Sequence, residues 1–164
     1  MPILDASTLE FFSRSPEQTR RLGARLGGLL QPSDLICLSG DLGAGKTTLV
    51  QGLVQGWGSL DNVTSPTFVL VNEYRRPDGN CLYHLDAYRL QNWLEGEDLD
   101  LDRMIENGPL VVEWPERIKE ALPANHLWVN LRWIADEQRA MTFLTHGERY
   151  ETLLNEFRKR VFGG

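Results

Sequence analysis

The sequence predicts an α/β fold with a mixed, partly parallel sheet and added antiparallel hairpins, and three observations support this. Short apolar runs at 35–38 and 110–112 are typical of strands buried on both faces. Segments with helical spacing of leucines separate these runs. Turn residues at 76–80 join two further strand-like segments, which predicts an antiparallel hairpin. Strands that interleave with helices in this way indicate an α/β domain.

Each element follows from a local signal. Ser15 is expected to cap a helix that begins near Pro16, because serine caps helices and proline suits the first turn. Segments rich in β-branched and aromatic residues are expected to be strands. The elements expected after this helix are a strand at 35–38, a loop at 40–45, a helix at 46–57, strands at 67–74 and 81–85, partly helical structure within 88–107, a strand at 110–112, a short helix at 115–121, strands at 127–133 and 139–144, and a helix at 148–161.

Length and composition predict one domain over residues 1–164. No apolar run reaches the roughly 18 residues that a membrane-spanning helix needs, so no membrane association is expected. The start of the chain lacks the pattern of a signal peptide, which favours a cytoplasmic protein. Cys37 and Cys81 lie in apolar segments, and we interpret them as small hydrophobic residues rather than as a disulfide or a zinc site.

The formal net charge of −6 argues against autonomous nucleic-acid binding, which usually requires a basic excess. The compact basic run at 158–160 ends the last expected helix, where cations complement the helix dipole. If a nucleic acid is involved, we expect a partner protein to hold it.

Residues 40–47 read Gly-Asp-Leu-Gly-Ala-Gly-Lys-Thr and match the phosphate-loop pattern G-x-x-x-x-G-K-[ST] without a mismatch. Glycines allow the backbone to point its N–H groups inward as an anion nest, and the following helix N-terminus adds partial positive charge. Lys46 is expected to reach the β- and γ-phosphates, and the Thr47 hydroxyl to coordinate Mg²⁺. A glycine-rich turn that matches by accident is the alternative, but the loop follows a strand and opens a helix, as phosphate binding requires.

Two carboxylates follow apolar strands, Asp86 after 83–85 and Glu113 after 110–112. The carboxyl ends of strands are where α/β sheets bind ligands, so we expect at least one of them to serve the metal. Which one contacts the ion directly stays open. His84 is interpreted as a hydrogen-bonded histidine within a strand, and Trp114 either covers the site or packs in the core.

The loop Thr64-Ser65-Pro66-Thr67 has two interpretations. Its hydroxyls could sense a γ-phosphate, as switch loops do, or it could be a capped turn before a strand. The residues alone do not separate these two.

Four motifs together resemble the TsaE (YjeE) family, the P-loop ATPases of bacterial tRNA threonylcarbamoyladenosine biosynthesis. They are Gly40 to Thr48, Thr64 to Phe68, Tyr83 to Leu90 and Glu113 to Glu116, and the resemblance spans about Ser15 to Arg139. It implies a three-layer P-loop NTPase fold and an ATPase that requires Mg²⁺. It also implies partnership with TsaB and TsaD, which carry out threonylcarbamoyl transfer to adenosine 37 of tRNA, so that tRNA is met only through the complex.

The resemblance also assigns roles to residues of this chain. Lys46, Asp86 and Glu113 are implied to be catalytic, with Asp86 at the Walker B position, and Thr47 and Glu113 to hold the metal. The segment 15–19 is implied to lie near the adenine. The residues implied to bind ATP are Asp41, Leu42, Gly43, Ala44, Gly45, Lys46, Thr47, Thr48, Thr64, Trp114 and Arg139.

Two other functions are weighed against a partner-dependent ATPase. A small-molecule P-loop kinase needs an arginine-bearing lid, and segment 88–107 offers only Arg89 and Arg103. A nucleotide-gated binding module that does not hydrolyse ATP would lack stimulation by partners. The acidic stretch 91–102 is either a solvated face or a surface for a basic partner.

Overall fold

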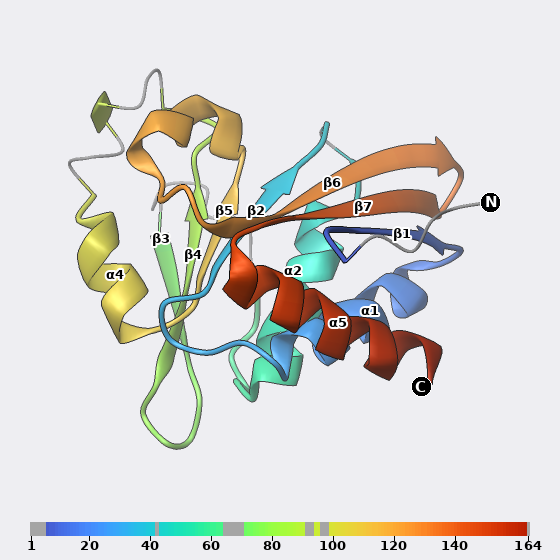
Figure 1. Cartoon of the computed structure of the whole chain (residues 1–164), viewed down its shortest axis with the longest axis horizontal. Coiled ribbons are helices and arrows are strands. Elements are labelled where there is room, and N and C mark those ends of the chain that lie inside the picture. Colours follow the sequence, from blue (N-terminus) through green and yellow to red (C-terminus); the bar gives the residue numbers. More distant parts are fainter. Residues whose placement is uncertain (1–5, 42, 64–70, 91–93, 96–98, 164) are drawn as a thin grey trace.

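A mixed β-sheet forms the centre of the molecule (Figure 1). The computed structural model of the chain describes residues 6–41, 43–63, 71–90, 94–95 and 99–163. Within these residues the sheet has seven strands in the order β1-β7-β6-β2-β5-β4-β3. The elements are β1 Thr8–Ser13, α1 Pro16–Gly27, β2 Leu35–Ser39, α2 Lys46–Trp57, β3 Val71–Arg75, β4 Cys81–Asp86, α4 Leu101–Asn107, β5 Leu110–Glu113, the 3-10 helix η1 Pro115–Ala121, β6 His126–Ala135, β7 Gln138–His146 and α5 Glu148–Phe162.

The sheet is parallel at its centre and antiparallel at its edges. Strand β2 pairs in parallel with β5 and β6, and β4 pairs in parallel with β5. The pairs β3–β4, β6–β7 and β1–β7 are antiparallel. The prediction of a mixed, partly parallel sheet with hairpin additions is therefore confirmed.

Side chains of the central strands are buried on both faces of the sheet. In β2, Ile36 and Leu38 belong to one hydrophobic cluster, whereas Leu35 and Cys37 belong to another. The first cluster takes its helical residues from α1, α2 and α5, and the second from α4 and η1. Figure 1 shows α1, α2 and α5 together on one side of the sheet and α4 on the other, which confirms the three-layer arrangement.

The start of α1 agrees with the sequence prediction. Ser15 has extended backbone angles, and its hydroxyl accepts a hydrogen bond from the backbone N–H of Gln18 at 3.2 Å. This contact satisfies one of the amides that the first turn leaves without a partner.

Strand β1 was not among the predicted elements. It is an edge strand that pairs only with β7 in the described part of the chain, and Phe12 within it is 63% exposed. An edge strand needs no regular alternation of buried residues, so its pattern is weak. Of the strand expected at 67–74, residues 67–70 lie outside the described residues, as does the loop at 64–67, and β3 begins at Val71.

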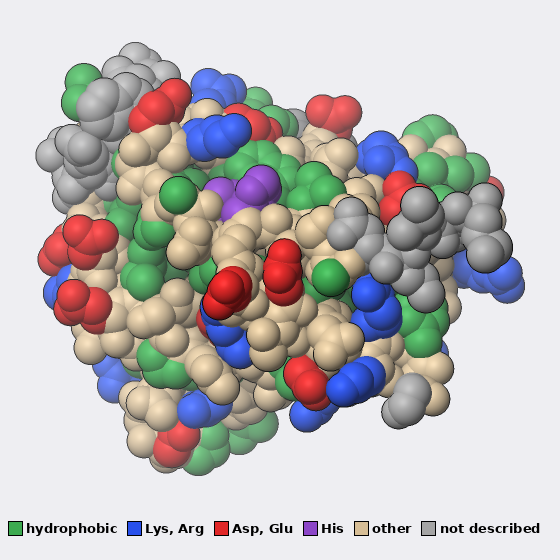
Figure 2. All heavy atoms as spheres, viewed as in Figure 1, with side chains coloured by type: hydrophobic (Ala, Val, Ile, Leu, Met, Phe, Trp, Pro, Cys, Tyr) green, Lys and Arg blue, Asp and Glu red, His purple; other side chains and the backbone are tan. Residues whose placement is uncertain are grey.

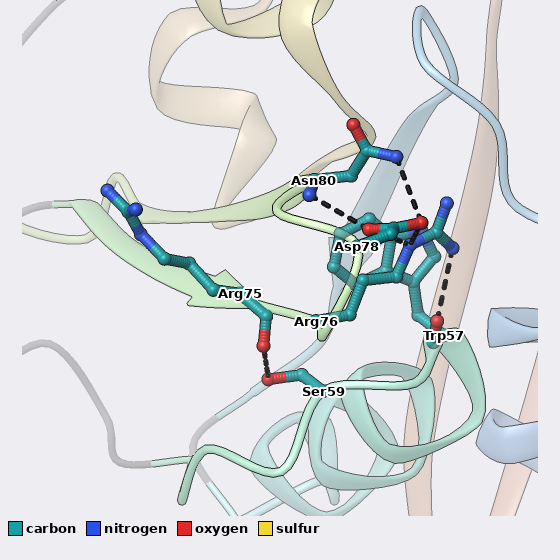
Figure 3. Close-up of polar contacts among 6 residues, drawn as sticks. All are labelled: Trp57, Ser59, Arg75, Arg76, Asp78 and Asn80. Atoms are coloured by element: carbon teal, nitrogen blue, oxygen red, sulfur yellow. Dashed lines mark hydrogen bonds and ion pairs between the residues drawn. The ribbon is translucent and has the colours of Figure 1, made fainter.

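The turn of the β3–β4 hairpin contacts the C-terminal end of α2 (Figure 3). The Arg76 guanidinium lies 4.4 Å from the centre of the Trp57 ring, and its Nη1 donates to the Trp57 carbonyl at 3.3 Å. Asp78 pairs with Arg76 at 2.8 Å and accepts a hydrogen bond from the Asn80 backbone at 2.9 Å, which lowers the pKa of Asp78. The Ser59 hydroxyl donates to the Arg75 carbonyl at 2.7 Å. A cation at the carbonyl end of a helix is favourable, so these contacts fix α2 from its C-terminal end.

Charged side chains of both signs share the surface of the molecule. Figure 2 shows acidic and basic side chains intermixed on the viewed face, without a continuous basic band. No helix among the described residues is long and apolar enough to cross a membrane.

Cys37 is buried and Cys81 is partly buried, and both are free. Burial raises the pKa of the Cys37 thiol, as expected for a small core residue.

Candidate functional site

The phosphate-loop motif connects the end of β2 to the start of α2. Gly43 and Gly45 have φ angles of 83° and 102°, in the left-handed region that favours glycine. Gly45 stands at the N-cap of α2, and no side chain of the described residues caps the helix amides there. The loop therefore leaves the helix N-terminus open to an anion, the arrangement that phosphate binding requires.

Lys46 is the first residue of α2, and its side chain turns back over the loop. The residue is only 5% exposed, its Nζ donates to the Gly40 carbonyl, and Nζ lies 3.8 Å from the centre of the Trp114 ring. Burial lowers the pKa of Lys46, and the negative charges of Glu113 and Asp86 oppose that effect. The Lys46 side chain thus lies at the phosphate loop with two carboxylates near it, and their charges favour its protonated form.

Asp86 and Glu113 end neighbouring parallel strands and are paired residues in the β4–β5 register. Glu113 is also the register partner of Leu38 on β2, which leads into the phosphate loop. Both carboxylates therefore lie at the carboxyl ends of the central strands, where the phosphate loop begins. Burial raises the pKa of Asp86, and a hydrogen bond from the Tyr88 backbone N–H at 3.0 Å acts against this rise.

Glu113 is 4% exposed and is bonded to a buried histidine. His84 Nε2 lies 2.5 Å from Glu113 Oε2, and His84 is fully buried. The interpretation of His84 as a hydrogen-bonded histidine within a strand is confirmed. The partner of His84 is Glu113, the candidate metal ligand, and the sequence did not indicate this pairing.

Trp114 has backbone angles of φ 57° and ψ 49°, which are rare for a bulky side chain and occur at functional sites. Its backbone N–H donates to the Leu38 carbonyl at 3.3 Å, and its ring lies 5.0 Å from that of Tyr88. The ring borders the site and also packs against the second hydrophobic cluster. Trp114 therefore takes both of the positions considered for it, at the pocket and against the core.

Arg139, near the start of β7, packs against the phosphate loop. The nearest neighbours of a side chain placed on Gly45 would be the Arg139 side-chain carbons and Nε, at 3.6–3.8 Å. Nη1 donates to the carbonyls of Asp136 and Gln138, at 2.8 and 3.0 Å. Nε is buried and makes no hydrogen bond to the part of the chain that the structure describes. An unsatisfied buried donor beside an anion nest suits a phosphate ligand.

Most of the candidate residues line one pocket of about 300 Å³. Its lining residues are Gly43, Gly45, Lys46, Thr47, Thr48, Asp86, Tyr88, Glu113, Trp114 and Arg139. Asp41 and Ala44 instead line a neighbouring cavity of about 490 Å³ that also borders Gly40 and Trp114. Leu42 and Thr64 lie outside the described residues.

Tyr88, two residues after Asp86, also lines the pocket and was not among the predicted site residues. In segment 15–19, Thr19 is buried and its hydroxyl lies 2.6 Å from that of Ser13, so the Thr19 side chain packs inside the fold.

In the acidic stretch 91–102, Asp100 pairs with Arg103 at 3.3 Å on an exposed surface.

The oxygen donors of the pocket suit a small hard cation. Two carboxylates and the Thr47 hydroxyl line it, and Mg²⁺ typically takes one or two carboxylates together with substrate phosphates and water. The described residues contain no group of three or more His, Cys, Asp or Glu side chains placed to hold a metal alone. The two carboxylates fit the one or two that Mg²⁺ takes when phosphate oxygens complete its coordination.

Comparison with known proteins identifies the family. The family model described as "Threonylcarbamoyl adenosine biosynthesis protein TsaE" matches residues 13–141. The chain belongs to the TsaE family. A TsaE protein of Streptomyces coelicolor is 48% identical over 139 residues, which cover 81% of this chain and 94% of that protein. The TsaE protein of Bacillus subtilis is 39% identical over 150 residues, or 90% and 92% of the two chains.

Among solved structures, the crystal structure of YdiB from Bacillus subtilis superposes with a TM-score of 0.78 and 34% identity. It covers 93% of this chain and 95% of that one. The family resemblance and the fold class expected from the sequence are thereby confirmed.

Proposed function

We propose that this TsaE-family chain binds and hydrolyses ATP in the pocket between the phosphate loop and the ends of β4 and β5. In this proposal it is a single P-loop ATPase domain that supports TsaB and TsaD in the threonylcarbamoyl modification of tRNA adenosine 37. One observation supports the proposal most strongly. The buried Lys46 ammonium lies at an open helix N-terminus and faces two carboxylates from neighbouring parallel strands.

Each residue receives a role from its position. The loop amides and Lys46 bind the phosphates, and Arg139 adds a donor from β7. Thr47 and Glu113 would hold Mg²⁺, and Asp86 would orient water at the site. Mg²⁺, when bound, neutralises charge on the β- and γ-phosphates. The rings of Trp114 and Tyr88 lie 5.0 Å apart and line the pocket, where they can contact the bound nucleotide.

The assembly role follows from the family and from the charge. The curated relatives are named for tRNA threonylcarbamoyladenosine biosynthesis. With a net charge of −6, this chain is unsuited to hold tRNA alone. We therefore assign tRNA contact to the partner proteins, and we assign ATP hydrolysis to resetting the complex rather than to the transfer itself. A cytoplasmic location suits this role.

The test is an ATP hydrolysis assay with and without purified TsaB and TsaD, on the wild type and on Glu113→Gln. We expect slow Mg²⁺-dependent hydrolysis, stimulation by the two partners together, and loss of that activity in the variant. Glutamine keeps the size of Glu113 but removes the charge that binds the cation. Stimulation that is absent for the wild type, or unchanged hydrolysis by the variant, would refute the proposal.

A screen for phosphate acceptors addresses the alternative of a small-molecule kinase. We expect inorganic phosphate as the product, with no phosphorylated acceptor. Stoichiometric transfer of the γ-phosphate to a small molecule would instead favour the kinase.

A further inference from the structure

A hydrogen-bonded chain of side chains crosses three neighbouring strands and ends at Glu113. The Asn72 amide on β3 donates to the Tyr74 hydroxyl at 3.3 Å, and that hydroxyl lies 3.4 Å from His84 Nδ1 on β4. His84 Nε2 lies 2.5 Å from Glu113 Oε2 on β5. Tyr74, His84 and Glu113 are 3%, 0% and 4% exposed, so solvent does not compete with these contacts.

The donors and acceptors of this chain fit one assignment. A carboxylate accepts, so Nε2 of His84 carries the proton that points to Glu113. In the tautomer with the proton on Nε2 only, Nδ1 can accept a hydrogen bond from the Tyr74 hydroxyl. The oxygen of that hydroxyl in turn accepts from Asn72. Contacts at both ring nitrogens therefore hold the orientation of the His84 ring between Tyr74 and Glu113.

We propose that His84 is a positioning residue that holds the Glu113 carboxylate through Oε2, so that the other oxygen, Oε1, is presented to the metal of the bound nucleotide. The inference rests on the proposed nucleotide site. Partners that orient metal-binding carboxylates change metal affinity by roughly 10- to 100-fold when they are removed. The strand register supports this role, because His84 lies two residues before Asp86 and so shares its face of β4.

Two amide substitutions separate positioning from mere filling of the core. In His84→Gln the side-chain amide reaches the place of Nε2 and can still donate to Glu113. In His84→Asn the shorter amide reaches only the place of Nδ1, next to Tyr74, and leaves Glu113 without its donor. His126→Asn serves as a matched control, because His126 is also buried (7% exposed) but lines a different cavity.

The measurement is calorimetric binding of the non-hydrolysable analogue AMP-PNP, with Mg²⁺ and with EDTA. We expect the gain in affinity from Mg²⁺ to fall roughly 10-fold or more in His84→Asn and to be largely retained in His84→Gln and His126→Asn. Binding in EDTA should be similar in all four proteins, which also reports that they are folded. Should one His84 variant fail to fold, Tyr74→Phe, which removes the hydroxyl that orients the ring, is expected to reduce the Mg²⁺ gain.

Two results would contradict these expectations. A wild type with no Mg²⁺-dependent binding would overturn the proposed function and this inference with it. A wild type with a normal Mg²⁺ gain that is equal in His84→Asn, His84→Gln and Tyr74→Phe would overturn only the role of His84.

Discussion

At the residue scale, the pocket brings together buried and partly buried charges that stabilise one another. Burying a charge alone is costly, so each must have a partner. Lys46 donates to the Gly40 carbonyl and faces Glu113 and Asp86, while Glu113 accepts from His84. A triphosphate and its metal add charges of both signs to a pocket whose own charges are already opposed. This balance explains how one pocket can hold a lysine next to two carboxylates.

A second buried histidine predicts how stability depends on pH. Burial lowers the pKa of His126, with further lowering by His146 and Lys119, while its Nδ1–H donates to the Pro123 carbonyl at 3.0 Å. The folded protein therefore favours neutral His126, and the unfolded chain takes up a proton first as the pH falls. Its contribution to stability is complete above a pH of about 6.5 and is lost as the pH falls from there toward the lower folded pKa.

We therefore expect the free energy of unfolding, measured by urea denaturation from pH 8 down to pH 5, to decline more steeply for the wild type than for His126→Asn. Asparagine can keep the hydrogen bond to Pro123 but does not titrate. Parallel curves for the two proteins would show that His126 does not contribute to the acid sensitivity.

At the element scale, the helix that carries the phosphate loop is fixed by close packing. Helices α1 and α2 approach so closely that a Cβ atom on Gly52 would lie 2.2 Å from the Arg20 carbonyl oxygen, and one on Gly56 would lie 1.9 Å from that of Ala24. Because these neighbours are backbone atoms, they cannot move aside cheaply. Together with the Arg76–Trp57 contact, this packing sets the position of α2 and hence of Lys46.

Gly52→Ala is expected to destabilise the protein by about 1–3 kcal/mol, because the added methyl group must push the two helices apart. Gly28→Ala is the control. Gly28 has φ −66° and its nearest neighbours would be 3.6 Å from a new Cβ, so we expect no loss or a gain of about 0.4–1 kcal/mol. Thermal unfolding of both variants tests this, and equal melting temperatures for Gly52→Ala and the wild type would contradict the packing argument.

The elements show where sequence-based prediction succeeds and where it ends. Helix α2, the central strands and the hairpins carry strong local signals, and the phosphate-loop motif indicates Lys46 and Thr47 directly. The pairing of His84 with Glu113 depends on the register of β4 against β5, which brings together residues 29 positions apart. The edge strand β1 depends on β7 for its hydrogen bonds. Such contacts arise from the tertiary arrangement, so a local pattern does not contain them.

At the scale of the whole molecule, the strand order assembles the pocket. Strands β2, β5 and β4 are neighbours, so the loop at 40–45, Glu113 and Asp86 meet at one edge of the sheet. Residue Arg139 reaches the same place from β7. The pocket therefore exists only in the folded state, and a nucleotide that binds it stabilises the fold, by about 2.7 kcal/mol at 100 times its dissociation constant.

The most direct test of the central claim is calorimetric titration of Mg-ATP into the wild type, Lys46→Ala and Lys119→Ala. Lys119 is an exposed lysine on η1 that lines a different cavity, so it controls for the loss of one positive charge. We predict one binding site in the wild type and in Lys119→Ala. We predict at least about 30-fold weaker binding in Lys46→Ala, which corresponds to about 2 kcal/mol for a lost buried charged contact. Equal affinity in the wild type and in Lys46→Ala would contradict the assignment of this pocket to ATP.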